Sequence, residues 1–443
     1  MGGRQAKLKL HWQILIALAL AVVAGRLSGM HGGLLGVSFY AVYDFVGTLF
    51  LNGLKMIIVP LVVSSIVTGV AGVGGALGLE RLGAKTLVYY LTTSLLAILT
   101  GLVLVNLLAP GVIHGQPALE VLGLSGQQAA QAAEKVRGHG AGDLAGIVLS
   151  LVPPNVIAAA ANGQMLGLIF FSILFGYFMT RIEESYAEAL YNFWQGLFEV
   201  MMRITGWVMK FAPIGVFALV AKVVAGIGPE ETQALAQSLG TFTLTVLLAL
   251  ALHALVTLPL LLRFVAKVSP RRHYRAMGPA LLTAFSTASS SATLPLTMEC
   301  VEKNAGVSNR TTSFVLPLGA TVNMDGTALY ECVAAMFIAQ AYGIDLSLTT
   351  QFTVVLIALL TSIGVAAVPA ASLVAITVIL SSIGLPVEAI GLILAVDRIL
   401  DMFRTAVNVF SDSCGAVLVG RLEGEEGILG NAGPNQAGAR QGA

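Results

Sequence analysis

The chain has 443 residues, of which 56% are hydrophobic and only 11% are charged. A typical soluble domain carries about 25% charged residues, so this composition leaves too few charges to solvate a soluble surface and predicts a polytopic membrane protein. The formal net charge is +1 and no dense basic patch is present, which argues against a nucleic-acid partner. Three scattered cysteines and six scattered histidines predict neither a disulfide framework nor a metal centre.

Six apolar stretches in the first 263 residues reach the length of about 20 residues that a helix needs to cross a bilayer. The second, fourth and fifth exceed one crossing, which predicts that they are tilted, broken or partly interfacial. The first is interpreted as a retained span and not as a cleaved signal peptide, because no clear cleavage site precedes a soluble domain. The predicted spans are 11–30, 43–76, 86–110, 146–180, 190–225 and 237–263.

Basic residues predict the orientation of these spans. Lys and Arg gather before the first span, after the second and after the sixth, whereas the segment GIGPEET after the fifth has none. The positive-inside rule then places the N-terminus in the cytoplasm. The polar insert 111–145 is interpreted as a flexible external loop, and the C-terminal tail as disordered.

Two apolar segments near the C-terminus are interrupted at their middle. TASSSATLPLT (287–297) and TSIGVAAVPAAS (361–372) each lie within a long stretch without charges. Because irregular backbone at membrane depth occurs only where protein or a water-filled cavity surrounds it, we predict two re-entrant helical hairpins with their tips at these breaks. The serines at 289–291 are also compatible with simple close packing of helices. Pro295 and Pro369 favour broken helices whose free N–H groups attract a carboxylate.

The segment DRILDMFRTAVNVFSD (397–412) predicts a helix with a polar stripe. Asp397, Asp401, Arg404, Asn408 and Asp412 fall within an arc of about 80° on one face. Ionisable residues at membrane depth mark an ion or substrate pathway. The alternative is a self-neutralising ladder of salt bridges, which the excess of carboxylates disfavours. Arg404 suits an anionic group and Asp401 an ammonium, so the pair favours acidic amino acids over C4-dicarboxylates.

A third break, LGATVNMDGTALYE (318–331), combines Asn323 and Asp325 with Gly326. Side-chain and backbone oxygens at such a break suit a hard cation such as Na⁺. The alternative is a glycine kink with a capping Asp. Glu331 at that depth is a candidate proton carrier, or else a permanently protonated carboxyl. Tyr90, Thr93 and Ser94, in one apolar span, form a weaker candidate because Ser and Thr often bond to their own helix.

SSSATLPLT, PLGATVNMDGTALYE, SIGVAAVP and LDMFRTAVNVFSD, in this order, resemble the glutamate transporter family of dicarboxylate/amino acid:cation symporters. The resemblance implies an all-α polytopic membrane protein with eight transmembrane helices and two re-entrant helical hairpins in inverted repeats. It implies a homotrimer in the bacterial inner membrane, with both termini cytoplasmic, in which a transport domain moves like an elevator along a scaffold. The implied scaffold is 1–76 and 146–225, the transport domain is 77–145 and 226–420, and the disordered tail is 421–443.

The resemblance also implies the functional residues, position by position. The transported species would be an acidic amino acid together with Na⁺. A proton would also be transported, because Glu331 matches a proton-carrying glutamate of animal relatives. No prosthetic group is implied. Ala288 and Met402 stand where relatives carry an additional arginine, which leaves potassium counter-transport open. Substrate contacts would come from Ser289, Ser290, Thr327, Val368, Ser372, Asp401, Arg404, Thr405 and Asn408. The first of three implied sodium sites would use Gly319, Asn323, Asn408 and Asp412. The second would use Tyr90, Thr93, Ser94, Asn323 and Asp325. The third would use carbonyls of Thr321, Ser362, Ile363 and Val365, and the second hairpin would close it as a gate.

Other functions remain open on the sequence. One is a purely proton-coupled symporter for glutamate or C4-dicarboxylates. An intramembrane hydrolase that uses the serine cluster would need a base beside the nucleophile, and no histidine follows His273. A dedicated anion channel would not need the Asp401 and Arg404 pair.

Overall fold

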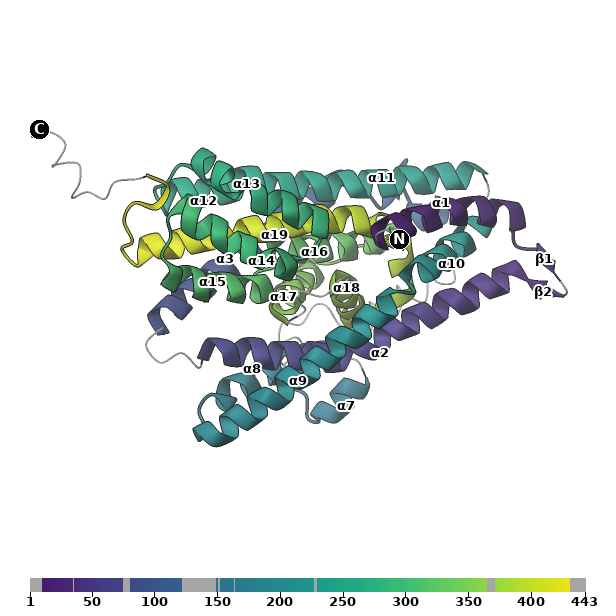
Figure 1. Cartoon of the computed structure of the whole chain (residues 1–443). Helices are drawn as coiled ribbons and strands as arrows, with labels where there is room; N and C mark the ends of the chain where they lie inside the picture. Colours follow the sequence, from purple (N-terminus) through teal and green to yellow (C-terminus); the bar gives the residue numbers. More distant parts are fainter. Residues whose placement is uncertain are drawn as a thin grey trace, which may run out of the picture.

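The computed structural model describes residues 10–430 except 35, 75–79, 122–148, 150–151, 163, 227–228 and 365–370. The described chain is almost entirely helical, which confirms the all-α prediction (Figure 1). The first half contains α1 (Leu10–Ser28), α2 (Phe39–Gly74), α3 (Glu80–Leu108), α4 (Ala118–Val121), α7 (Val156–Ala161), α8 (Met165–Met179), α9 (Glu184–Met209) and α10 (Ala212–Ala225). Two small antiparallel pairs join them: β1 (Gly33–Leu34) with β2 (Val37–Ser38), and β3 (Val112–Ile113) with β4 (Gln116–Pro117).

The second half is a run of shorter helices. A π-helical turn (His253–Thr257) joins α11 to α12, and another (Cys300–Ala305) joins α14 to α15. Short 3-10 turns lie at Val387–Leu392 and Ile428–Gly430. The helices are α11 (Pro229–Leu252), α12 (Leu258–Phe264), α13 (Pro270–Thr287), α14 (Ser290–Glu299), α15 (Asn309–Val322), α16 (Asp325–Ala341), α17 (Leu348–Gly364), α18 (Ala371–Ser382) and α19 (Leu394–Leu422).

Each of the six predicted spans is mostly helical within the residues that the structure describes. By length and composition, three described helices can cross a membrane: Phe39–Gly72, Arg81–Leu108 and Thr232–Phe264. The pair α9 and α10, bent by 52° at Lys210 and Phe211, adds a fourth if the two helices are counted as one span. A broken helix is one of the three alternatives predicted for the span 190–225, and the bend agrees with it. The predicted span 43–76 is instead one helix of 36 residues that contains Pro60.

Two groups of helices are visible in Figure 1. The helices α2, α8 and α9 lie together at one side, while α11, α13 and α19 lie at the other. In the first group, α10 packs against α1 and α2, and α2 also packs against α8 and α9. In the second, α16 packs against α3, α17, α18 and α19. Nearly every side chain of α16 is buried, so this helix forms the centre of the hydrophobic core.

Part of the predicted loop 111–145 is ordered, contrary to expectation. Residues 112–121 form the β3–β4 pair and α4. Ile113 and Ala118 are buried against Ala341, and the Gly111 N–H donates to Gln340 Oε1 over 3.2 Å. This small apolar contact with the end of α16 orders the segment, while 122–145 lies outside the described residues.

The prediction that the tail 421–443 is disordered is wrong for its first ten residues. Ile428 and Leu429 are buried, and the Glu425 carboxylate accepts hydrogen bonds from the Ser308 N–H (2.8 Å) and the Ser308 hydroxyl (2.6 Å). Lys85 at the start of α3 hydrogen-bonds Glu423, and this contact lowers the pKa of the Glu423 carboxyl. Apolar burial and these polar contacts attach 421–430 to the helices, while 431–443 lies outside the described residues.

Candidate functional site

The predicted break at NMDGT separates α15 from α16. Asn323 (φ −101°, ψ 87°) and Met324 (φ −114°, ψ 53°) depart from helical geometry. Both helices pack against α19, so the break faces the polar stripe of that helix. Gly326 allows the close approach, because a Cβ at this position would lie 2.8 Å from the Arg404 carbonyl oxygen.

Asp412 of α19 lies beside Asn323 at this break. The Asn323 amide donates to Asp412 Oδ1 over 2.9 Å, and both side chains are buried. A Cβ on Gly319 would lie 2.6 Å from both Asp412 Oδ1 and the Tyr90 hydroxyl. Thr93 Oγ1 donates to Asn323 Oδ1 over 3.4 Å. The predicted sodium residues of α3, α15 and α19 therefore lie together in one buried, oxygen-rich region.

Asp325 is the second carboxylate of this region. Its Oδ1 accepts a hydrogen bond of 2.7 Å from Ser94, and its Oδ2 accepts one of 2.6 Å from Ser411. His253 Nε2, from the π-helical turn after α11, lies 3.0 Å from the same Oδ2. Asp325 is thus held by side chains from three different helices.

Asn408 joins α19 to the first turn of α16. Its Oδ1 accepts a 2.7 Å hydrogen bond from the Gly326 N–H, and its Nδ2 donates to Thr327 Oγ1 over 3.1 Å. Asn408 does not contact Asn323 or Asp412 through any hydrogen bond of the described residues, although the resemblance implies one shared sodium site. It lies instead between the oxygen-rich region and Arg404.

Arg404 is the most deeply buried charge of the polar stripe, with a side chain 1% exposed. Its Nη2 lies 3.1 Å from Asp397 Oδ1 and 3.0 Å from Asp401 Oδ1, and its guanidinium carbon lies 3.9 Å from the centre of the Tyr330 ring. Within the described part of the chain, its Nε and Nη1 have no hydrogen-bond partner. A buried guanidinium with two free nitrogens is suited to a carboxylate ligand.

The first predicted hairpin consists of α13 and α14, which pack against each other. Ala288 between them adopts the left-handed conformation (φ 48°, ψ 40°), and Ser289 Oγ caps α14 by accepting from the Ala292 N–H over 3.2 Å. Ser290 is buried at the first position of α14, and α14 packs against α19. The break therefore occurs where the sequence predicts it.

The second predicted hairpin consists of α17 and α18, which also pack against each other. Ser372 and Thr405 are buried, and the Ser372 hydroxyl has no partner among the described residues. Ser362 lies at the end of α17, and α15, which carries Thr321, packs against α17. The predicted sites Val365 and Val368, and the Ile363 side chain, lie outside the described residues.

Glu331 is fully buried on α16 and faces α17. The Thr361 hydroxyl donates to its Oε2 over 3.0 Å, and its Oε1 has no partner in the described ranges. The predicted proton carrier thus lies at the contact between α16 and the first helix of the second hairpin.

Several residues of the site were not predicted. They are His253, Tyr330, Arg398 and Ser411. His253 could have been noticed as an ionisable residue within an apolar span, and Ser411 as the neighbour of Asp412. No sequence signal distinguishes Tyr330, because its contact with Arg404 depends on how α16 packs against α19.

Comparison with known proteins assigns the chain to a family. Residues 10–422 match the sodium:dicarboxylate symporter family. The chain belongs to this family. It is 38% identical over 420 residues to the proton/glutamate-aspartate symporter of Escherichia coli K12, a match that covers 95% of this chain and 94% of that protein. It is 36% identical over 422 residues to the proton/sodium-glutamate symport protein of Bacillus caldotenax (95% and 96%). It is 36% identical over 461 residues to the mouse excitatory amino acid transporter 3 (95% and 87%).

Members of the sodium:dicarboxylate symporter family are transporters by name, which agrees with the resemblance found in the motifs. An intramembrane hydrolase would need a base beside the serine cluster at 289–291. His253 and His273, the histidines of the second half, contact Asp325 and Ser413. Neither is hydrogen-bonded to these serines as a general base would be.

Proposed function

We propose that this protein is a secondary active symporter that takes up aspartate and glutamate together with Na⁺ and a proton. The observation that carries the proposal is Arg404, buried between Asp397 and Asp401 with its Nε and Nη1 free within the described residues. A neutral ligand would leave these donors unpaired, which costs free energy in a buried site. The names of the relatives, which are glutamate and glutamate-aspartate symporters, support the same substrate.

In this proposal Arg404 binds the side-chain carboxylate of the substrate and Asp401 binds its ammonium group. The capped start of α14 at Ser289 and Ser290 supplies N–H groups for the second carboxylate, since helix N-termini favour anions. The remaining contacts come from Thr327, Thr405 and Asn408, and from the second hairpin through Val368 and Ser372.

The cation part of the proposal rests on the oxygen-rich region between α3, α15, α16 and α19. Na⁺ is a hard cation that prefers carboxylate, amide, hydroxyl and carbonyl oxygens. Asp325 and Asp412 supply the charge, and Asn323, Ser94 and Tyr90 lie within reach of them. The carbonyls of Thr321, Ser362, Ile363 and Val365 are the proposed third site, which the second hairpin closes as a gate.

Glu331 is the proposed proton carrier. Its burial against Thr361 of α17 supports the role, because a buried carboxyl that crosses the membrane without its charge avoids a large desolvation cost. Its position connects proton binding to the helix pair that we propose as the gate.

The proposed transport mechanism is an elevator with eight transmembrane helices and two re-entrant hairpins. The packing of α1, α2, α8, α9 and α10 among themselves supports a separate scaffold (1–76 and 146–225). The packing of α16 against α3, α17, α18 and α19 supports one transport body (77–145 and 226–420). Both termini would lie in the cytoplasm and the protein in the bacterial inner membrane.

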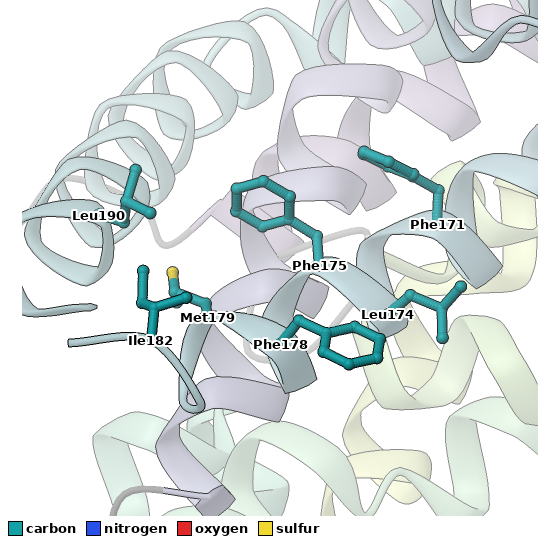
Figure 2. Close-up of a pocket in the computed structure, with 7 residues that line it drawn as sticks. All are labelled: Phe171, Leu174, Phe175, Phe178, Met179, Ile182 and Leu190. Carbon is teal, nitrogen blue, oxygen red and sulfur yellow. The ribbon is translucent and has the colours of Figure 1, made fainter. Parts of the chain in front are cut away.

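A homotrimer formed through the scaffold is part of the proposal. An apolar groove of about 370 Å³ lies on α8 and the start of α9 (Figure 2). Phe178 on its rim is 60% exposed, and Figure 2 places Phe175 and Leu190 on facing sides of the groove. A neighbouring subunit packed here would bury these aromatic side chains. A cysteine introduced at Phe178 should then crosslink subunits in membranes, and its failure to do so would remove this support.

Uptake of labelled aspartate and glutamate into proteoliposomes tests the function. Sodium, proton and potassium gradients are imposed separately on the purified protein. Accumulation above equilibrium that requires an inward sodium gradient is the expected result. Uptake that no gradient can drive above equilibrium would overturn the proposal in favour of a channel.

The alternative is a symporter coupled only to protons. The relative from Escherichia coli, at 38% identity, is named a proton/glutamate-aspartate symporter and supports this candidate. Undiminished uptake in sodium-free buffer under a proton gradient would show that coupling is to protons alone.

A further inference from the structure

Arg398 is a second arginine beside the proposed ammonium site. It lies on α19, and its Nη1 is 3.2 Å from Asp401 Oδ2. Its side chain is 11% exposed and that of Asp401 is 16% exposed, so the pair lies at the accessible rim of the Arg404 cluster. Within the described residues, its buried Nη2 has no hydrogen-bond partner.

Both oxygens of Asp401 are therefore engaged by arginines. Oδ1 lies 3.0 Å from Arg404 Nη2, and Oδ2 lies 3.2 Å from Arg398 Nη1. The formal charges of Asp397, Asp401, Arg398 and Arg404 cancel. Without Arg398 this cluster would carry a net negative charge that attracts an ammonium group and repels a carboxylate.

We propose that Arg398 is a specificity-determining residue that competes with the substrate ammonium for Asp401. The inference rests on the proposed function, in which Asp401 binds that ammonium. When a diacid without an amino group occupies the site, Arg398 keeps Asp401 paired, so its carboxylate is not left buried and uncompensated. When an amino acid binds, its ammonium displaces Arg398 from Oδ2. Arg398 thus reduces the factor by which the site prefers amino acids to diacids that lack an amino group.

A purely structural role makes a different prediction. An Arg–Asp pair three residues apart on one helix can simply stabilise that helix. Its loss would then weaken the binding of every ligand by the same factor. The ratio of two ligand affinities separates the two roles, because a general loss of stability cancels in the ratio.

The experiment measures inhibition of labelled aspartate uptake by unlabelled aspartate and by succinate, which has the same two carboxylates and no ammonium. The wild-type chain in proteoliposomes is compared with Arg398→Gln, Arg398→Met and Arg398→Lys. Met keeps the length of the apolar stem should the Gln variant fail to fold, and Lys keeps the charge. Arg203→Gln, at an exposed arginine of α9, is the matched control.

The ratio of the succinate to the aspartate inhibition constant should rise about tenfold in the Gln and Met variants, as loss of a close charge contact predicts. It should stay within about twofold of the wild-type value in the Lys variant and in the control, since their site charge is unchanged. Three results would overturn the role of Arg398. The first is an unchanged ratio in both neutral variants, and the second is an equal rise of the ratio in the Lys variant. The third is wild-type protein that succinate does not inhibit. Wild-type protein that accumulates neither aspartate nor glutamate would instead overturn the proposed function itself.

Discussion

Thr361 of α17 donates a hydrogen bond of 3.0 Å to Oε2 of Glu331 on α16, and both side chains are fully buried. The second oxygen of Glu331 has no partner among the described residues. The only hydrogen bond of this carboxyl within the described chain therefore comes from the first helix of the second predicted hairpin. Protonation or substitution of Glu331 therefore alters a direct contact with the helix pair that we propose as the gate.

Replacing Glu331 by Gln should separate proton coupling from substrate binding. A Gln amide oxygen can still accept from Thr361, but the side chain cannot release a proton. Uptake of aspartate driven by an inward proton gradient should be lost, while binding of aspartate in the presence of sodium stays within a few-fold of wild type. Uptake into proteoliposomes at imposed pH differences measures the first effect, and equilibrium binding measures the second.

Thr361→Val is the control for this variant, because it removes the hydrogen bond and keeps the carboxyl. It should retain proton-driven uptake. If Glu331→Gln responds to a proton gradient as the wild type does, Glu331 is not the proton carrier.

Replacing Arg404 by Ala or Cys should abolish the uptake of aspartate and glutamate. The truncation removes the proposed carboxylate clamp and leaves Asp397 buried without its partner. Loss of one member of a buried charge pair costs about 2–5 kcal/mol, which predicts a fall in affinity of about 30-fold to several-thousand-fold. Competition binding with labelled aspartate measures this, with thermal unfolding as the check on folding. Wild-type affinity in either variant would exclude Arg404 from the site.

Replacing Asp412 by Asn should reduce the stabilisation of the protein by sodium, because it disables one of the three proposed sodium sites. A ligand that binds only the folded state stabilises it by about 2.7 kcal/mol at 100 times its dissociation constant. The melting temperature of the wild type should therefore rise when NaCl replaces choline chloride, and that of Asp412→Asn should rise less. Asp44→Asn, on the surface of α2, is the control and should keep the rise. An equal rise in Asp412→Asn would argue against its role in cation binding.

Gly319→Ala should destabilise the protein, because the new Cβ would lie 2.6 Å from Asp412 Oδ1 and from the Tyr90 hydroxyl. Overpacking of this kind costs about 1–3 kcal/mol. Gly240→Ala in α11 is the matched control, since nothing lies within 4 Å of its Cβ, and it should be neutral or slightly stabilising. Thermal unfolding in detergent compares the two, and equal melting temperatures would refute the crowding at Gly319.

Much of the fold could be read from local patterns. Long apolar stretches predict helices wherever they occur, and the breaks at Ala288 and Asn323 follow from small, polar and proline residues in apolar surroundings. The order of residues 421–430 could not be predicted, because it depends on contacts of Glu425 with Ser308 and of Ile428 with the core. The ordered segment 112–121 depends in the same way on Ala341.

The sequence by itself determined the membrane class and the polar stripe of the last helix, because composition and helical spacing are local properties of the chain. The family followed from the resemblance of four motifs and their order. Only the tertiary structure decided which partners each polar group meets. The approach of Arg398 to Asp401 is a choice of rotamer, and the contacts of His253 and Ser411 with Asp325 depend on helix packing. These contacts join residues that are far apart in sequence, or side chains with several possible directions, and burial in one core selects among them.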